Sequence, residues 1–287
     1  MRDLYRFCIS SLLFLALFIF LYFAKVIKEV RDGYYKYTVP GREIYNAINK
    51  SNKKTNKKKL IIGDSTGNQF YNNYEEEDSI YSIACNQAIG MCGHFFLLDD
   101  FLKKGNRPKK VYMIFNIFTL SNNLDQEYTY HYFLKPFFNE KYKERMSNNV
   151  ILQIEKIPHY RLSQFPTIIK STWAPTYKPH KQYQLMSPIS NEYFLKMDSL
   201  QSLYDFELFL VPSLIPQNKK QKIEENYENY MWEIDTRLQQ CIQKYIGCIT
   251  YVDDSCFRDG THLKHPLLYK HIIEEKMKDS NLLFRTK

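Results

Sequence analysis

The stretch KLIIGDS (residues 59–65) joins a short apolar run to a glycine and two small polar residues. Such a run predicts a buried strand that enters a tight turn. Three further apolar runs have the length of strands: residues 111–115, 206–211 and 248–252. Helical patterns alternate with them, at residues 94–104 and, as a long amphipathic segment, at 222–245. The sequence therefore predicts an α/β fold with a central parallel sheet and helices on both faces.

The composition is that of a folded protein rich in tyrosine and phenylalanine. Hydrophobic residues make up 44% and charged residues 25%, which are ordinary globular values and exclude wholesale disorder. The mean hydropathy of −0.47 excludes a polytopic membrane protein. Six cysteines are too sparse for a disulfide-framed miniature and lack a zinc-binding spacing, so the sequence predicts no metal; their pairing stays open.

One segment is long and apolar enough to cross a membrane. FCISSLLFLALFIFLYFA (residues 7–24) carries no charged side chain. As a helix it covers about 27 Å, close to the ~30 Å hydrocarbon core of a bilayer. The alternative is a cleaved signal peptide, whose apolar region is usually about 7–15 residues. We expect an uncleaved single-pass anchor at residues 1–24. Basic residues flank both ends, so the positive-inside rule leaves its orientation open.

Residues 25–58 are polar and basic, and we expect them to form a linker to a folded domain at residues 59–287. The net charge is +9, and five lysines between residues 53 and 59 supply much of this excess. A run of lysine and asparagine is typical of a solvated linker, which argues against a nucleic-acid partner. If the run binds anything, anionic lipid headgroups or an acidic glycan are the expected contacts.

Two motifs at opposite ends of the folded region carry residues suited to nucleophilic catalysis. Ser65 closes the first predicted strand on a sharp turn, where its hydroxyl is exposed and its amide can stabilise an oxyanion. A serine hydroxyl needs a base to take its proton. His262 follows the last predicted strand, and Asp259 precedes it by three residues, so the carboxylate can orient the ring. Alone, each motif is commonplace: a helix-capping turn and a short surface turn.

Together the two motifs resemble the SGNH/GDSL hydrolase superfamily, whose fold is a three-layer α/β/α sandwich. GDS at residues 63–65 matches the first sequence block of that superfamily, and DGTH at residues 259–262 matches the last. The resemblance covers about residues 59–287. It implies that Ser65 is the nucleophile, His262 the general base and Asp259 the residue that orients it. No cofactor is implied.

The middle blocks of that superfamily, which supply the oxyanion hole, match less well. Its second block is an Asn-x-x-Ile-x-Gly segment, and here NQAIGM (residues 86–91) has its glycine one place early. The amide of Gly90 or Met91 is therefore the expected donor beside the amide of Ser65. The third block, Gly-x-Asn-Asp, is absent. Asn116 is the expected remaining donor, with an ordinary strand-end asparagine as the alternative; losing one donor typically costs about 10²–10³ in rate.

Residues 121–205 are too many for one crossover helix and are rich in aromatic residues. This insertion leaves the carboxyl end of the second predicted strand, the edge where the site must lie. Tyr130, Tyr132 and Trp173 are expected to bind substrate, because aromatic faces stack on sugar rings. The alternative is an ordinary hydrophobic subdomain.

The anchor and the missing third block make the chain look like the membrane-anchored members of the superfamily that modify cell-envelope polysaccharides, the DltD and AlgJ types. This resemblance implies a serine esterase or O-acyltransferase acting on acyl esters, commonly acetyl esters, of an extracytoplasmic glycan. The implied partners are the glycan, the membrane through residues 7–24, and a multi-span acyltransferase. The alternative is a non-catalytic envelope protein that binds glycan or such a partner.

Overall fold

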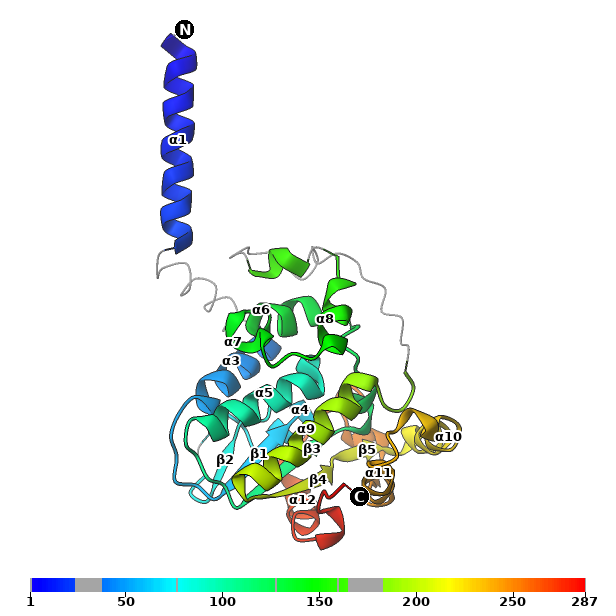
Figure 1. Cartoon of the computed structure of the whole chain (residues 1–287). Coiled ribbons are helices and arrows are strands. Elements are labelled where there is room, and N and C mark those ends of the chain that lie inside the picture. The colour runs from blue at the N-terminus through cyan, green and yellow to red at the C-terminus, as the bar shows by residue number, and fades with distance from the viewer. Residues whose placement is uncertain are drawn as a thin grey trace.

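The computed structural model describes residues 2–23, 38–75, 77–126, 128–158, 160–164 and 183–286. Its centre is a parallel sheet of four strands in the order β2-β1-β3-β4 (Figure 1). The strands are β1 (Lys59–Gly63), β2 (Ile80–Ser82), β3 (Lys110–Phe115) and β4 (Glu207–Pro212). About 58% of the described residues are helical. The predicted α/β class with a central parallel sheet is therefore confirmed.

A second, two-stranded parallel sheet follows directly from the first. After Ser213, β4 gives way to β5 (Leu214–Pro216), which pairs with β6 (Thr250–Val252). The apolar run at residues 248–252 thus forms a strand, but it pairs with β5 and not within the four-stranded sheet. The sequence pattern did not predict β2 and β5, because each has only three residues and β5 ends in a proline.

The described helices differ widely in length. They are α1 (Arg2–Phe23), α3 (Val39–Ser51), α4 (Ser65–Asn68), α5 (Gly90–Lys103), α6 (Lys135–Phe137), α7 (Glu140–Lys143), α8 (Asn148–Glu155), α9 (Pro188–Tyr204), α10 (Lys220–Tyr230), α11 (Gln239–Gly247) and α12 (Lys270–Lys276). Helix α1 is long and apolar enough to cross a membrane, and none of the apolar window is buried against the rest of the chain. Residue 24, the end of the predicted span, lies outside the described residues.

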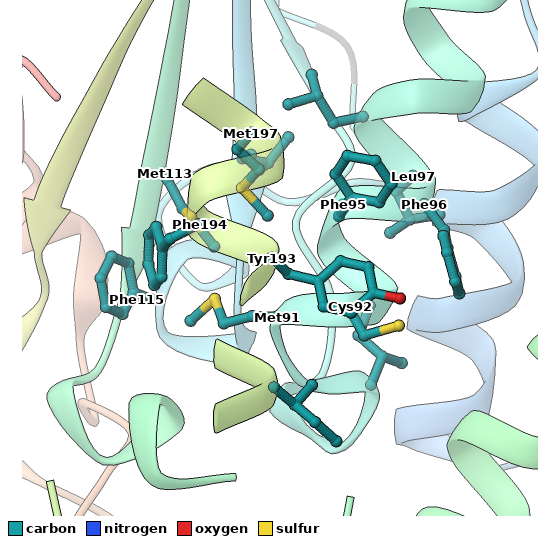
Figure 2. Close-up of a cluster of buried hydrophobic side chains, with 14 of the residues drawn as sticks. Met91, Cys92, Phe95, Phe96, Leu97, Met113, Phe115, Tyr193, Phe194 and Met197 are labelled. Atoms are coloured by element: carbon teal, nitrogen blue, oxygen red, sulfur yellow. The ribbon is translucent and has the colours of Figure 1, made fainter. Parts of the chain in front are cut away.

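Each face of the sheet has its own hydrophobic core, because successive residues of a strand point to opposite faces. On one face, Met113 and Phe115 of β3 pack with residues of α5 and α9, as Figure 2 shows. On the other face, Tyr112 and Ile114 belong to a cluster that includes Ile273 of α12. Both faces of β3 are therefore buried, which explains why this strand is a continuous apolar run.

Residues 39–51 are a helix, which corrects the expected linker at residues 25–58. Ile44 and Ala47 on α3 are fully buried in the core of the domain. Thr38 caps the helix by accepting the N–H of Gly41 at 3.2 Å, and Pro40 lies in its first turn. Proline is well suited to the start of a helix, so Pro-Gly here marks a helix start and not an isolated turn. The folded domain thus begins before residue 59.

The region predicted as an insertion over residues 121–205 is largely part of the main core. Helix α9 is the crossover to β4, and its Tyr193 and Phe194 are fully buried beside α5 (Figure 2). Between residues 130 and 157, buried aromatic side chains pack into the same cluster. These described parts fit the alternative of an ordinary hydrophobic assembly. Residues 165–182 lie outside the described residues.

The amphipathic segment at residues 222–245 is two helices, α10 and α11, and not one. The chain leaves the helical path at Glu233, whose carboxylate accepts the N–H groups of residues 184, 185 and 186. Asn191 on α9 then accepts the N–H of Asp235 at 2.8 Å. These contacts across the fold compete with helical hydrogen bonding and break the segment.

Candidate active site

Ser65 lies at the point where the strand order of the sheet reverses. Strand β1 has β2 on one side and β3 on the other. The connection from β1 to β2 therefore runs to one side of β1, and the connection from β2 to β3 crosses back to the other side. In open α/β sheets, ligands bind at such a switch point, outside the carboxyl ends of the strands. Ser65 is the second residue after β1 and the first residue of α4. The turn that presents it is therefore at the edge where a ligand site is expected.

Two glycines allow this turn to lie directly against β3. Gly63 has a φ of +125°, and a Cβ atom placed there would lie 1.9 Å from the carbonyl oxygen of Ile114. A Cβ atom at Gly67 would lie 2.7 Å from the same oxygen. Only glycine fits such close backbone approach without displacing the strand. The apolar run followed by Gly-Asp-Ser-Thr-Gly thus has a packing reason as well as a chemical one.

Asp64 is fully buried and fixes the turn through both carboxylate oxygens. Oδ1 accepts the N–H and the hydroxyl of Thr66 at 2.8 and 2.5 Å. Oδ2 accepts the N–H of Asn116 at 2.8 Å and the hydroxyl of Thr119 at 2.6 Å. Burial raises the pKa of this carboxyl, and these hydrogen bonds counteract the rise. Asp64 is thus a structural clamp between the ends of β1 and β3.

The structure brings Ser65, His262 and Asp259 into one hydrogen-bonded chain. His262 Nε2 lies 2.9 Å from Ser65 Oγ, and His262 Nδ1 lies 2.9 Å from Asp259 Oδ2. The tautomer that donates Nδ1–H to Asp259 leaves Nε2 free to accept the serine proton. This is the geometry that the spacing of the two motifs predicts, reached across 197 positions of sequence.

Asp259 is held in place by the turn that it shares with His262. Its Oδ1 accepts the N–H groups of Thr261 at 3.0 Å and His262 at 2.8 Å. Burial alone would raise the pKa of Asp259, but the hydrogen bonds and the imidazole of His262 lower it below its ordinary value. The carboxylate is therefore ionised at neutral pH. Its side chain is 56% exposed, and contact with water also favours the ionised form.

The loop that carries His262 is tied to α4 by Gln69, a residue that the motif analysis missed. Gln69 Oε1 accepts the N–H of Leu263 at 3.0 Å. Leu263 and Phe257 are buried and pair across the loop in an isolated antiparallel bridge. Gln69 lies one helical turn after Ser65, so the same short helix fixes both the serine and the loop of the base. No local signal in the sequence marks it.

A cavity of about 740 Å³ opens beside Ser65 and His262. Most of the other side chains that line it are polar or charged. They are Glu43, Asn68, Gln69, Asn72, Tyr74, Glu75, Asn86, Arg258, Asp259 and Lys264, with Pro40, Phe70, Leu263, Pro266 and Leu267. Pro40 and Glu43 come from α3, in the segment expected to be a linker. The cavity is larger than water needs and is suited to a polar organic ligand.

The candidate oxyanion donors lie in different places. Asn86 lines the cavity, whereas Gly90, Met91 and Asn116 are buried and are not among the described residues that line it. Asn116 has 3% of its surface exposed, and its side-chain oxygen accepts the N–H of Phe118. Its backbone N–H is used by Asp64. Of the expected second-block segment, residues 86–91, Asn86 is thus the residue that lines the cavity.

The predicted sugar-binding aromatics lie elsewhere among the described residues. Tyr130 is only 3% exposed and belongs to the main core cluster, and Tyr132 packs against that cluster. Neither lines the cavity beside Ser65. Both are therefore packing residues in this structure, because the segment after residue 128 folds onto α5. Trp173 lies outside the described residues.

No metal or relative adds to this geometry. Within the described part of the chain, no group of three or more His, Cys, Asp or Glu side chains is arranged to hold a metal ion. Comparisons with protein-family models, curated proteins and solved structures find no match to this chain. The geometry of the site is therefore the evidence for function.

Proposed function

We propose that this chain is a membrane-anchored serine esterase or O-acyltransferase of the SGNH type. The observation that carries the proposal is the hydrogen-bonded chain from Ser65 Oγ through His262 to Asp259, at 2.9 Å for each link. Its position at the carboxyl edge of the sheet, beside a polar cavity, supports the same proposal. The proposed domain is a three-layer α/β/α sandwich, and α1 is its anchor.

The proposed reaction begins when Ser65 Oγ attacks the carbonyl carbon of an ester. His262 Nε2 takes the serine proton, and the carbonyl oxygen becomes an oxyanion held by the Ser65 amide and a second donor. The bond from the carbonyl carbon to the alcohol oxygen then breaks, and His262 returns the proton to the leaving alcohol. Ser65 is left acylated.

In the second half of the reaction, His262 takes a proton from an acceptor hydroxyl, whose oxygen attacks the acyl carbon. The bond from that carbon to Ser65 Oγ then breaks, and His262 returns the proton to Oγ. Water as acceptor gives hydrolysis, and a sugar hydroxyl gives transfer. The acyl-enzyme is common to both, so the two outcomes share every residue named above. An acetyl group on a cell-envelope glycan outside the cytoplasm is the proposed cargo, and a multi-span acyltransferase the proposed partner.

A fluorophosphonate probe tests this proposal, since it reacts only with an activated serine. We expect covalent labelling of the wild-type protein and none of the Ser65→Ala variant. Ser199→Ala is the matched control, because Ser199 is exposed on α9 and its hydroxyl donates to the helix carbonyl of Leu195. Absence of Ser65-dependent labelling would leave the alternative of a non-catalytic envelope protein.

A further inference from the structure

Glu43 is an acidic residue in the wall of the cavity that the Ser65-His262-Asp259 chain does not use. It comes from α3, far from both sequence motifs, and lines the same cavity as Ser65 and His262. The helix that carries it is fixed to the domain: the side-chain amide of Asn73 donates to the backbone carbonyl of Glu43 at 3.0 Å. The carboxyl is therefore held at the site by the fold.

Two polar atoms in this wall have no hydrogen-bond partner among the described residues. They are Oε2 of Glu43 and Nε2 of Gln69, and both are buried. Unpartnered buried polar atoms are rare and destabilising, so each needs an explanation. One is an acceptor when the carboxyl is ionised, and the other is a donor. A ligand hydroxyl, which both donates and accepts, can become the partner of either atom when its side chain turns toward the cavity.

Glu43 also has the electrostatic environment of a functional carboxyl. Burial raises its pKa from 4.5 to about 7, while His262 and a hydrogen bond from Asn68 lower it only in part. Asp64 adds a small rise. The further titratable or charged groups around it are Tyr74 and Cys85, which interact with it electrostatically, and Glu75, Arg258, Asp259 and Lys264, which share the cavity wall.

We propose that Glu43 is a substrate-binding residue that accepts hydrogen bonds from hydroxyl groups on the alcohol half of the ester. Asn86 in the same wall suits the same ligand class, because it carries a side-chain amide group whose oxygen accepts the N–H of Ala88. Glu43 would thus select esters of polyhydroxylated alcohols over esters of apolar ones. This inference rests on the proposed function and names the residue that recognises its substrate.

Two esters with the same acetyl group separate substrate recognition from the acyl chemistry. One is a mono-O-acetylated methyl glucoside, which has free hydroxyl groups, and the other is p-nitrophenyl acetate, which has none. In Glu43→Ala, kcat/KM for the sugar ester is expected to fall about tenfold or more, mainly through KM. The loss for p-nitrophenyl acetate is expected to be smaller, because this ester has no hydroxyl group for Glu43 to bind. An equal loss on both esters would overturn the proposal.

The conservative variant Glu43→Gln supplies a readout that a packing role would not move. A hydroxyl donates more strongly to a carboxylate than to a carboxylic acid. KM of the wild-type protein for the sugar ester should therefore fall as the pH rises through about 7, where Glu43 ionises. In Glu43→Gln this change should disappear. Glu228→Gln, an exposed carboxylate on α10, is the matched control and should keep it.

Binding without turnover distinguishes failure of this inference from failure of the proposed function. Methyl glucoside carries no acyl group, so calorimetry measures its binding even if Ser65 proves unreactive. Weaker binding to Glu43→Ala than to the wild-type protein and Glu228→Gln would support the role of Glu43, whatever the reaction. Equal binding to all three proteins, or none to any, would overturn it.

Discussion

The Asp64 carboxylate accepts the backbone N–H of Asn116 at 2.8 Å, across 52 positions of sequence. This bond joins the residue after β1 to the residue after β3, directly beneath the turn that carries Ser65. The Asp of the Gly-Asp-Ser motif is therefore bound to backbone and hydroxyl donors and is fully buried. Its task is to hold the serine turn against the sheet.

Replacing Asp64 by Asn should destabilise the protein by about 3 kcal/mol or more. An amide cannot accept from all four donors, and its own NH₂ group would face N–H and O–H groups in a buried site. Urea unfolding measures the loss. Asp279→Asn is the control, because Asp279 caps Asn281 in an exposed turn, and it should cost at most about 1 kcal/mol. Similar small losses in both variants would contradict the clamp.

The sequence was sufficient to locate Ser65, His262 and Asp259, because strand ends and turns leave local signals. An apolar run followed by glycine marks the carboxyl end of a strand, and parallel strands bring such ends to one edge. The sequence pattern alone therefore assigns the three residues to one site. Their roles in catalysis remain predictions.

Glu43 and Gln69 could not be found in this way, since tertiary contacts alone bring them to the cavity. Glu43 lies on a helix whose polar and basic sequence resembles a linker. The burial of Ile44 and Ala47 and the hydrogen bond from Asn73 fix that helix to the domain. Asn116, the predicted side-chain oxyanion donor, is not among the described residues that line the cavity. Periodicity does not show that the Asn116 side chain turns back to cap Phe118.

The second oxyanion donor can be identified by comparing Asn86→Ala with Asn116→Ala. The two variants are matched, because each asparagine accepts the N–H of the residue two places on, Ala88 or Phe118, so each loses a similar cap. We expect Asn86→Ala to lower kcat for p-nitrophenyl acetate by about 10²-fold, since Asn86 lines the cavity. Asn116→Ala should lower stability and change kcat little; the reverse result would restore Asn116 as the donor.

Full-length protein should remain in the membrane fraction after high-salt and carbonate washes, if α1 is an uncleaved anchor. Arginine in place of Leu15 should weaken this association, because a charge near the middle of a span costs about 2.5–3.5 kcal/mol. Leu203→Arg, at an exposed position of α9, is the control and should leave the membrane association unchanged. A soluble mature form starting near residue 25 would instead indicate a cleaved signal peptide.

Asp259→Asn should lower kcat by less than the roughly 10⁴-fold that a buried triad carboxylate supplies, because its side chain is 56% exposed and water can replace part of its effect. The pKa of Asp259 is lowered in the folded protein. Its contact with His262 is thus fully present above the unfolded value of about 3.9 and is lost only as the pH falls through the lower folded value.

Acid loss of activity above about pH 5 should therefore not come from Asp259. Rates measured from pH 4 to 9 in the wild-type protein, Asp259→Asn and Asp254→Asn test this. Asp254 is an exposed neighbour that accepts the N–H of Asn218, so its variant should behave as wild type. An acid limb between pH 5 and 9 that disappears only in Asp259→Asn would contradict the assignment.

Glu43→Gln should stabilise the protein at alkaline pH while leaving its stability at acid pH nearly unchanged. The folded pKa of Glu43 is raised from 4.5 to about 7, so the folded state holds its proton more tightly than the unfolded chain. The contribution of Glu43 to the free energy of unfolding is therefore fully present below about pH 4.5 and is lost as the pH rises through about 7. A glutamine carries no charge at any pH and avoids this loss.

The size of the effect follows from the shift in pKa. A rise to about 7 corresponds to about 3 kcal/mol at full ionisation, so Glu43→Gln is expected to exceed the wild-type protein by up to that amount at pH 8. Urea unfolding at pH 5 and pH 8 measures it, with Glu228→Gln as the exposed control. If Glu43→Gln weakens the protein equally at both pH values, the carboxyl serves packing. A gain confined to pH 8 would show that the fold retains a destabilising carboxyl beside Ser65, as functional sites commonly do.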